Sequence, residues 1–441
     1  MLQAQSIEGS THNSIFICAN GAVQTVGGNN YGELGDGTNI YKTIPVQIPG
    51  FTGVIGMSGG NSHCLFVKND GTAWATGSNG LGQLGDGTLV NKNYPIQITA
   101  LTGIVAVAAG PAFSFFLKSD GTVWSVGYNY FGELGDGTNT NKTNLVQVVG
   151  LTSITAVAAG GDHSIFLKND GTVWMAGRNF YGQFGNGTVI NHNIPIQVPG
   201  LTGVTAIAAG GAYSVFLKND GTVWATGENG YGQLGDGTQY NQRTVPVQVI
   251  GMTGVTAIAA GGHHTLFLKN DNTVWATGYN SSGQLGDGTI TTRTTAFQIP
   301  GLTGITAISA GDFHSLFLKN DNTVWSVGDN GSGQLGVGSV VDKTTPVQVQ
   351  GLCSGPLATV EVEETEHLSI YPNPCTDQLH VEVGDFASTT LTLYTMQGQL
   401  LYEMNLDQTN TTLALPTLKA GIYLVQVKSP KGILVKKIVK R

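Results

Sequence analysis

Short hydrophobic stretches separated by Gly-, Asn- and Asp-rich segments follow one another along most of the chain. Between residues 154 and 198, the segments 154–159, 163–168, 172–176 and 196–198 are hydrophobic, with many β-branched and aromatic residues that favour strands. The second and third segments flank Asp170-Gly171. An Asp-Gly pair is typical of a type I′ hairpin turn, in which both central residues take positive φ. The pattern predicts four short antiparallel strands.

This four-strand pattern recurs seven times at an almost fixed period. Each copy contains Gly-Gln-Leu-Gly-Asp-Gly-Thr or a close variant, and the central hydrophobic residues are spaced by 50 residues, once by 51: Leu34, Leu84, Leu134, Phe184, Leu234, Leu285 and Leu335. A Trp precedes this residue by ten positions in six copies, and Gln24 takes its place in the first. A period of this length with β composition is typical of a solenoid or a propeller.

The two ends of the repeat region favour a closed ring. Residues 5–9 resemble the first strand of the other copies, and the last copy stops near Leu352 without an equivalent strand after it. We therefore predict that the N-terminal strand completes the last blade, which would leave no open sheet edge. An open solenoid would need polar caps at both ends, and none is visible. The expected fold is an all-β, seven-bladed β-propeller over residues 1–352.

Composition agrees with this fold and excludes several classes of protein. Gly accounts for 65 of 441 residues, charged residues for 11% and hydrophobic residues for 40%, which argues against disorder and against a helical bundle. The net charge of −8, without a basic cluster before the last residues, argues against nucleic-acid binding. No apolar run is long enough for a membrane-spanning helix. The four Cys lack metal-ligand spacing, and three disulfide connectivities are possible, none of which the sequence favours. We expect the four Cys to be unpaired packing residues, and Cys353 and Cys375 are the one pair of interest because they are close in sequence.

The pattern changes after residue 352. Residues 353–367 hold four Glu and read as an acidic linker. In residues 368–441 the repeat is lost, and strands are expected at 379–383, 391–394, 400–402, 422–427 and 435–439. Several short alternating strands in so short a segment predict a small Ig-like β-sandwich domain.

The repeat resembles that of the regulator of chromosome condensation family. The similarity lies in Asp162-His163-Ser164, in the hairpin from Asp170 to Trp174 and in the loop from Gly227 to Thr238. The resemblance implies a seven-bladed propeller but no single function, because function depends on the loops. The founding eukaryotic member exchanges nucleotide on a small nuclear GTPase and binds chromatin. The uniform copies here, without a long insertion or a basic tail before them, argue against both activities.

The C-terminal segment resembles the sorting domain of the type IX secretion system of Bacteroidetes. The similarity lies in Tyr371-Pro-Asn-Pro374, Met396-Gln-Gly398, Ala420-Gly-Ile-Tyr423 and the terminal Lys cluster. The sorting-signal residues would be Pro372, Asn373, Pro374, Gly398, Gly421, Tyr423, Lys436 and Lys437. The resemblance implies contact with the secretion machinery and export through the periplasm to the cell surface or the medium. Residues 2–5 then resemble the end of a cleaved signal peptide.

Candidate catalytic chemistry is scarce. His63, His163, His264 and His314 share one repeat position with Phe113, Tyr213 and Asn13, which predicts packing instead of metal binding. The repeated Asp of the Gly-Asp-Gly turns is replaced by Asn186 and Val337 in two copies, and nucleophile-elbow and EF-hand patterns are missing. We expect neither a metal nor a cofactor, and no enzymatic activity.

The copies differ most in the aromatic positions of the Gly-x-Asn-x-x-Gly loops, which a propeller presents on one face. The candidate binding residues, with two charged neighbours, are Tyr31, Tyr128, Tyr130, Phe131, Arg178, Phe180, Tyr181, Glu228, Tyr231 and Tyr279. Exposed aromatic rings suit a protein or glycan partner. Alternatively, each ring packs against its neighbouring blade.

The sequence thus predicts a monomeric, secreted or surface-attached propeller that binds an extracellular protein or glycan. One alternative is an inhibitor of a secreted hydrolase, a role that a bacterial propeller of the resembling family performs. A third possibility is a glycan-acting enzyme, which would need two carboxylates converging on one mouth of the ring.

Overall fold

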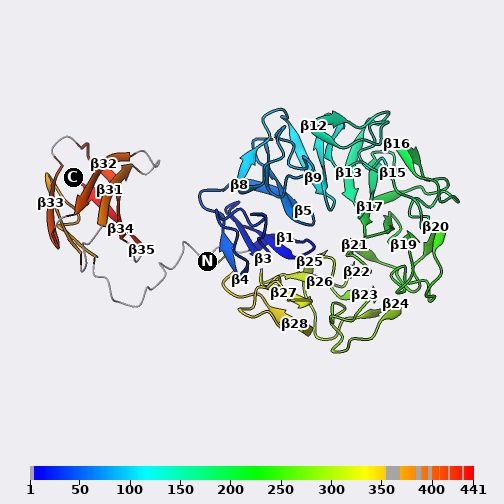
Figure 1. The fold of residues 1–441 in the computed structure, drawn as a ribbon. Coiled ribbons are helices and arrows are strands. Elements are labelled where there is room, and N and C mark those ends of the chain that lie inside the picture. Colours follow the sequence, from blue (N-terminus) through cyan, green and yellow to red (C-terminus); the bar gives the residue numbers. More distant parts are fainter. Residues whose placement is uncertain are drawn as a thin grey trace. The chain divides into compact units, whose positions relative to one another are not determined.

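Seven four-stranded antiparallel sheets surround a central axis in the computed structural model, as blades of a β-propeller (Figure 1). The structure describes residues 4–353, 368–383, 389–395, 400–406, 408–415, 418–429 and 432–441. They fall into two units, Met1–Gly355 and Pro356–Arg441.

Each blade consists of four consecutive strands, from the innermost to the outermost. Blades one to four comprise β1 (Ala4–Gly9), β2 (Asn13–Cys18), β3 (Val23–Gly27) and β4 (Lys42–Gln47); β5 (Val54–Gly59), β6 (His63–Lys68), β7 (Ala73–Gly77) and β8 (Lys92–Gln97); β9 (Ile104–Ala109), β10 (Phe113–Lys118), β11 (Val123–Gly127) and β12 (Lys142–Gln147); β13 (Ile154–Ala159), β14 (His163–Lys168), β15 (Val173–Gly177) and β16 (His192–Gln197). Blades five to seven comprise β17 (Val204–Ala209), β18 (Tyr213–Lys218), β19 (Val223–Gly227) and β20 (Arg243–Gln248); β21 (Val255–Ala260), β22 (His264–Lys269), β23 (Val274–Gly278) and β24 (Arg293–Gln298); β25 (Ile305–Ala310), β26 (His314–Lys319), β27 (Val324–Gly328) and β28 (Lys343–Gln348). The four predicted strands per repeat are confirmed.

The tight turn between the second and third strands differs from its prediction. In blade four the N–H of Gly171 donates to the carbonyl of Lys168 at 3.0 Å, and Gly171 alone in the turn has positive φ, at 75°. Asp170 instead accepts hydrogen bonds from the amide and hydroxyl of Thr172. This is a type I turn followed by a left-handed Gly, not type I′, because the Asp-Thr bonds hold Asp170 in the ordinary backbone region. Asn272 and Asn322 take the left-handed position in blades six and seven.

The hydrophobic core lies between blades. One cluster joins Phe115 and Leu134 of blade three to Phe166 of blade four, with Trp174 packed against its edge. Lys168 lies 5.7 Å from the ring of Trp174, and four other blades have an equivalent Lys–Trp contact. Each blade is therefore stabilised by its two neighbours.

The prediction that the N-terminal strand completes the last blade is wrong. β1 pairs with β2 inside the first blade, and the last blade has four strands of its own, β25–β28. A short turn from Gly9 to Asn13 makes β1 and β2 a local hairpin, so β1 has no reason to pair elsewhere. The first and last blades lie side by side (Figure 1).

A disulfide joins these two blades. Cys18 at the end of β2 is bonded to Cys353, 335 residues later, and the N–H of Cys353 donates to Oε1 of Gln24 at 2.8 Å. Cys18 and Gln24 occupy the positions of Lys168 and Trp174, so the generic Lys–Trp contact is replaced by a covalent link. The expectation of unpaired Cys is therefore wrong for Cys18 and Cys353, and Cys353 does not pair with Cys375. The expectation is confirmed for Cys64 and Cys375, which are buried free thiols. Distance along the sequence was a poor guide to the disulfide partner, because a closed ring brings the two ends of the propeller together.

A polar link repeats at the interface between adjacent blades. His163 is fully buried, and its Nε2 lies 3.0 Å from Oγ of Ser214 in the next blade, whose hydroxyl donates to the carbonyl of Gln183. His63, His264 and His314 make the same contact, the last of them with Ser14 across the junction of blades seven and one. The packing role predicted for these histidines fits this arrangement.

The second unit is a two-sheet sandwich. One sheet has the order β29-β30-β33 and the other β32-β31-β34-β35, with bounds β29 (Leu368–Tyr371), β30 (Gln378–Val383), β31 (Thr389–Thr395), β32 (Leu400–Leu406), β33 (Asn410–Ala414), β34 (Gly421–Ser429) and β35 (Gly432–Lys440). Its core includes Leu379, Leu391, Leu393, Val425 and Ile438. The predicted sandwich is confirmed, and it contains two strands that the sequence pattern did not predict, β29 and β33. The predicted acidic linker lies almost wholly outside the described residues.

The disulfide generates the first prediction. Cys18→Ser should lower the free energy of unfolding by about 2–4 kcal/mol, because the cross-link closes a very long loop in the unfolded chain. The Cys18→Ser/Cys353→Ser double variant is the matched control and should be no less stable than the single variant. Denaturant unfolding of the parent with and without reductant should reproduce the same difference, and equal stability of parent and variants would contradict a closing role.

The buried histidines generate a second prediction. Burial lowers the pKa of His163, His264 and His314 from 6.5 to about 3, and that of His63 to about 4. The folded protein therefore keeps these rings neutral, while the unfolded chain binds protons below pH 6.5, so stability is lost as the pH falls from 6.5 towards 3.

The expected loss between pH 7 and pH 4.5 is about 2–3 kcal/mol per histidine. His163→Phe, which introduces the residue found at Phe113, should lose less stability between pH 7 and pH 4.5 than the parent. His12→Gln, at an exposed histidine, should behave like the parent. Identical pH profiles of His163→Phe and parent in thermal unfolding would refute the linkage.

Candidate binding surface

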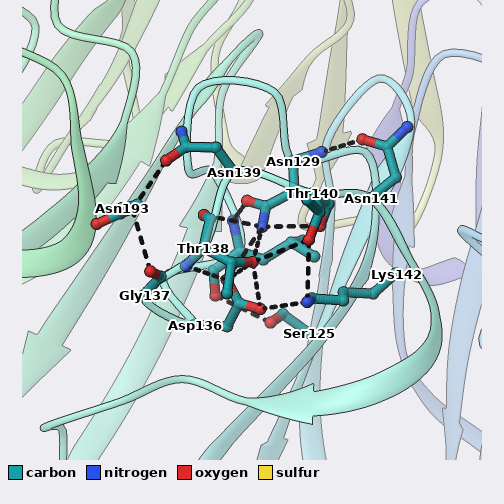
Figure 2. Close-up of polar contacts among 11 residues, drawn as sticks. Ser125, Asn129, Asp136, Gly137, Thr138, Asn139, Thr140, Asn141, Lys142 and Asn193 are labelled. Carbon is teal, nitrogen blue, oxygen red and sulfur yellow. Dashed lines mark hydrogen bonds and ion pairs between the residues drawn. The ribbon is translucent and has the colours of Figure 1, made fainter.

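The loops between the third and fourth strands of each blade, here called the C–D loops, hold their shape through internal polar contacts. In blade three, Asn129 Nδ2 donates to Asp136 Oδ1 at 3.0 Å and to the carbonyls of Thr138 and Thr140, while its Oδ1 accepts from Leu134 N–H (Figure 2). Asp136 also accepts from the amide and hydroxyl of Thr138. Asn129 is buried, and the pattern repeats around the ring. The loop is therefore rigid without help from its aromatic residues.

The repeated Asp residues are structural. The Lys142 ammonium lies 3.2 Å from Asp136, and equivalent ion pairs occur in blades one, two, five and six. Partial burial alone would raise the pKa of Asp136, but the hydrogen bonds from Thr138 and Asn129 and the contact with Lys142 keep it below its usual value. Asn186 accepts the same Thr bonds in blade four. These carboxylates are engaged in loop contacts, so they are poor candidates for catalysis.

Four of the predicted aromatic residues form a first aromatic cluster, defined by Tyr130, Phe131, Phe180 and Tyr181 of blades three and four. The rings of Tyr130 and Phe131 lie 4.9 Å apart, and those of Phe180 and Tyr181 lie 5.1 Å apart. The Arg178 guanidinium lies 5.0 Å from Phe131, 5.6 Å from Phe180 and 5.9 Å from Tyr181, so it joins the two pairs. The cluster is continuous across two blades.

Exposure divides this cluster into two kinds of residue. Tyr130 is 65% exposed and Phe180 is 59% exposed, whereas Phe131 and Tyr181 are half-buried. Tyr130 and Phe180 are thus as exposed as a binding patch requires, whereas Phe131 and Tyr181 are half-buried, as the packing alternative requires. Tyr130 and Phe180 present their rings to solvent, while Phe131 and Tyr181 support them.

A second aromatic cluster comprises Tyr231 and Tyr279, which were predicted, with His263 and Phe313, which were not. Tyr231 lies 4.6 Å from Tyr279 and 5.2 Å from His263, and Tyr279 lies 6.0 Å from Phe313. His263 Nδ1 lies 3.2 Å from Oε2 of Glu228. Glu228 is therefore placed against this cluster, as expected for a polar neighbour.

The two remaining candidates differ from the clustered ones. Tyr128 is half-buried, and burial, with the nearby Glu133 and Asp162, raises its pKa. Tyr31 on blade one is 46% exposed, and within the part of the chain that the structure describes no ring–ring contact includes it.

Three residues of this face were missed because they lie in another loop. Asp162, His263 and Phe313 directly precede the buried histidine position of their blades, and Arg178 Nη1 lies 3.0 Å from Asp162 Oδ2. The backbone explains this proximity, since Arg178 N–H donates to Asp162 O and Tyr279 N–H to His263 O. The sequence could have indicated these residues, because the position directly before the buried histidine also varies between copies. In other blades it holds Ser62, Ala112 and Ala212.

A second group of exposed apolar residues follows the Gly-Asp-Gly-Thr segments. Their side chains are 57–80% exposed and include Ile40, Tyr41, Leu89, Val90, Tyr240 and Ile290. Asn39 Nδ2 donates to the carbonyl of Asn30, which ties this end of the loop to the end that carries Tyr31. The C–D loops therefore expose apolar surface at both ends.

A central cavity of about 440 Å³ opens beside the second cluster. Its lining comes from the innermost strands and the Gly-rich turns that follow them, and it includes His263 and Phe313. The second cluster thus extends to the mouth of the cavity. Among the described residues, no group of His, Cys, Asp and Glu is arranged to hold a metal ion.

Several predicted sorting residues are brought together in the second unit. Asn373 Oδ1 accepts from Val439 N–H at 2.9 Å, which ties the Pro372–Pro374 segment to β35, the strand that carries Lys436 and Lys437. Tyr423 on β34 donates its hydroxyl to the carbonyl of Lys419 at 2.8 Å, and Gly421 begins that strand. Lys436 is exposed. Gly398 lies outside the described residues.

The exposure pattern generates a third prediction. Tyr130→Ala/Phe180→Ala should shift the thermal midpoint by no more than a few degrees, since exposed substitutions usually change stability by less than about 0.5 kcal/mol. Phe131→Ala/Tyr181→Ala is the matched control and should be clearly less stable, because it removes half-buried rings from beneath Arg178. If both double variants unfold at the same temperature, the division into exposed and supporting rings is incorrect.

Comparison with known proteins agrees with this architecture. Residues 95–370 match the RCC1-like domain, residues 20–67 and 70–117 match the regulator of chromosome condensation (RCC1) repeat, a second model of that repeat matches residues 54–83, and residues 369–441 match the secretion system C-terminal sorting domain. No curated protein is similar enough in sequence to be detected as a relative.

Solved structures show the same fold. Human WBSCR16 is 25% identical, with a TM-score of 0.65 over 70% of this chain and 84% of that one. Yeast RCC1 (Prp20), in its complex with Kap60, is 21% identical, with a TM-score of 0.68 over 80% of this chain and 86% of that one. Prp20p from Saccharomyces cerevisiae, solved in a study of its binding to Gsp1p and histones, is 20% identical, with a TM-score of 0.68 over 80% and 88%.

The sorting domain indicates export to the medium or the outer-membrane surface, and it implies contact with the secretion machinery. No helix among the described residues is long and apolar enough to cross a membrane. The chain therefore belongs to the RCC1-like propeller family and is a secreted member of it, carrying a C-terminal sorting domain.

Proposed function

We propose that this secreted propeller binds an extracellular protein through the face that carries its C–D loops, without catalysing a reaction. The observation that carries the proposal is the first aromatic cluster, in which Tyr130 and Phe180 are exposed although the loops beneath them are fixed by their own polar contacts. Aromatic residues and Arg dominate the energetic centres of protein interfaces. Arg178, already placed among these rings, supplies the polar member.

Ring geometry favours a protein over a glycan. Tyr130 and Phe131 cross at 89°, and Phe180 and Tyr181 cross at 87°. Edge-to-face pairs present ridges to solvent and not the flat platform on which a sugar ring stacks. A ridged apolar surface around a charged residue matches the irregular surface of a folded protein. An inhibitor of a secreted hydrolase is one form of this function, in which the partner is the hydrolase.

The glycan-acting alternative has one observation in its favour. Glu8 and Asp312 both line the central cavity, so two carboxyl groups share one cavity. Glycoside hydrolysis, however, needs environments that keep one carboxyl protonated and the other ionised. Here burial raises the pKa of both groups. Both environments raise the pKa, so they do not keep one carboxyl protonated and the other ionised. This supports binding without catalysis.

The test is a partner-capture experiment with the full chain, followed by affinity measurement. Surface proteins cross-linked to the parent are identified, and each is titrated against Tyr130→Ala/Phe180→Ala. Because one hot-spot residue contributes about 2 kcal/mol or more, the loss of even one of the two should weaken binding at least about thirtyfold. The matched control, Ile55→Ala/Val105→Ala, removes two exposed apolar side chains from the opposite ends of the strands and should bind like the parent.

Equal binding by the aromatic variant and the control would refute the proposed surface. Capture of a polysaccharide in place of a protein would refute the proposed class of partner. Cleavage of that polysaccharide would instead support the glycan-acting alternative.

A further inference from the structure

One position on each innermost strand points towards the next blade at the wall of the central cavity. In blade seven Ser309 occupies it, and its Oγ accepts from Gly9 N–H of blade one at 3.0 Å. In blade two Ser58 occupies it and accepts from Ala109 N–H of blade three at 3.1 Å. Four other blades have Ala at this position: Ala108, Ala158, Ala208 and Ala259. In six of the seven blades, a small residue therefore occupies this position at the wall of the central cavity.

Blade one has Glu8 at this position. Its Oε2 accepts from Ser309 Oγ at 3.2 Å, and the Gly59 backbone and the Ser58 side chain of blade two also act to lower the pKa of the carboxyl group. Glu8 lies in the cavity lining, and the described residues of that lining include no Lys or Arg. The carboxylate therefore faces the cavity with hydrogen-bond partners but without a cationic side chain of its own chain.

This arrangement destabilises the fold near neutral pH. Burial raises the pKa of Glu8 from 4.5 to about 7 in spite of its hydrogen bonds. Because the pKa of Glu8 is higher in the folded than in the unfolded state, the folded state binds this proton more tightly. The resulting contribution to the free energy of unfolding is fully present below pH 4.5 and is lost as the pH rises through about 7. Residues that lower stability are characteristic of functional sites. The other six blades have Ser or Ala at this position, so a carboxyl group is not a general requirement of the repeat.

We propose that the central cavity binds an organic cation, a protonated amine or a guanidinium group, with Glu8 as its counter-ion. The hydroxyl oxygens of Ser58 and Ser309 lie beside the carboxylate and can accept further hydrogen bonds. At the mouth, Asp312 adds a second carboxyl group, and Phe313 adds an aromatic ring, which attracts cations through its π face. Gly, Ala, Val and Ile make up much of the remaining lining, which also includes Ser10, Thr11 and Asn61, and these small and apolar residues leave room for the aliphatic part of such a ligand.

The cation has two possible sources with the same chemistry. It is either the end of a Lys or Arg side chain of the partner, in which case the inference rests on the proposed function, or a free small amine. The second aromatic cluster reaches the cavity mouth through His263 and Phe313, so a protein bound there can insert a side chain.

The ligand test uses the full chain at pH 8 with pairs of probes that differ in charge. N-acetyl-arginine amide is compared with N-acetyl-citrulline amide, and n-butylammonium with n-butanol, by calorimetry or NMR titration. The parent should bind the charged member of each pair at least about tenfold more tightly, the value expected for one charge-assisted hydrogen bond. Failure to prefer the charged probes would overturn the proposal.

Glu8→Gln, which keeps the size and hydrogen-bonding ability of the side chain, should remove this preference, whereas Asp312→Asn at the mouth should weaken it less. Retained charge preference in Glu8→Gln would also overturn the proposal. Glu8→Gln should unfold at the same or a higher temperature than the parent at pH 8. A clearly lower midpoint would mean that Glu8 is a structural link between blades.

A pH titration of the parent gives a readout that needs no variant. Binding of n-butylammonium should strengthen between pH 6 and pH 8, as Glu8 loses its proton. The other titratable groups near Glu8 are the buried Cys64 thiol on β6, whose pKa is raised by burial and by Glu33 and Glu8, and Asp312, His263 and His12 at the mouth. Asp312→Asn should therefore keep the pH dependence, and a pH-independent affinity in the parent would count against Glu8.

Partner binding separates this inference from the proposed function. If Glu8→Gln weakens both the partner and the amine probes, the cation is a partner side chain. If it weakens only the probes, the ligand is a free amine. Loss of partner binding in the aromatic variant, with no amine binding in the parent, would leave the proposed function standing and remove the cavity site.

Discussion

Contact between neighbouring blades is the interaction on which the rest of the structure depends. A single four-stranded sheet cannot bury its own hydrophobic side chains, so residues such as Phe166 and Leu134 are shielded only where two blades meet. Seven such contacts form only if the first and last blades also meet. Closure of the ring therefore depends on the contact between the first and last blades, which are far apart in sequence.

The first and last blades are joined at the positions that form the Lys–Trp contact in other blades. The Lys–Trp contact of other blades is replaced by the Cys18–Cys353 disulfide and the bond between Gln24 and the Cys353 amide. The His–Ser link is kept across the junction, by His314 and Ser14. The junction is thus an ordinary blade contact with a covalent addition, and it needs no strand shared between blades.

The repeat itself determines much of the fold, and these features could be predicted from the sequence. Four strands per copy, the number of blades and the face carrying the C–D loops all follow from the period and its glycines. Features that depend on three-dimensional neighbours could not be predicted in this way. The disulfide joins residues 335 positions apart, the partner of β1 is decided by a local hairpin, and the turn at Asp170 is set by bonds to Thr172. For the binding surface, the aromatic positions were identifiable because they vary between copies. His263 and Phe313 were missed because they belong to a different loop that only the strand pairing brings alongside.

In a chain of nearly identical copies, departures from the repeat carry the most information, and the first copy holds several. Cys18 and Gln24 are explained by closure of the ring, since both contact Cys353. Glu8 is not explained in this way. Gly9 N–H is already satisfied by Ser309, and elsewhere Ser or Ala fills the same position without a charge. A carboxylate at a position where the other blades have Ser or Ala, at the wall of the central cavity and near an aromatic mouth, fits a contribution to binding. The first blade then has two roles. Cys18 and Gln24 close the ring through their contacts with Cys353, and Glu8 on the innermost strand places a carboxyl group in the cavity wall.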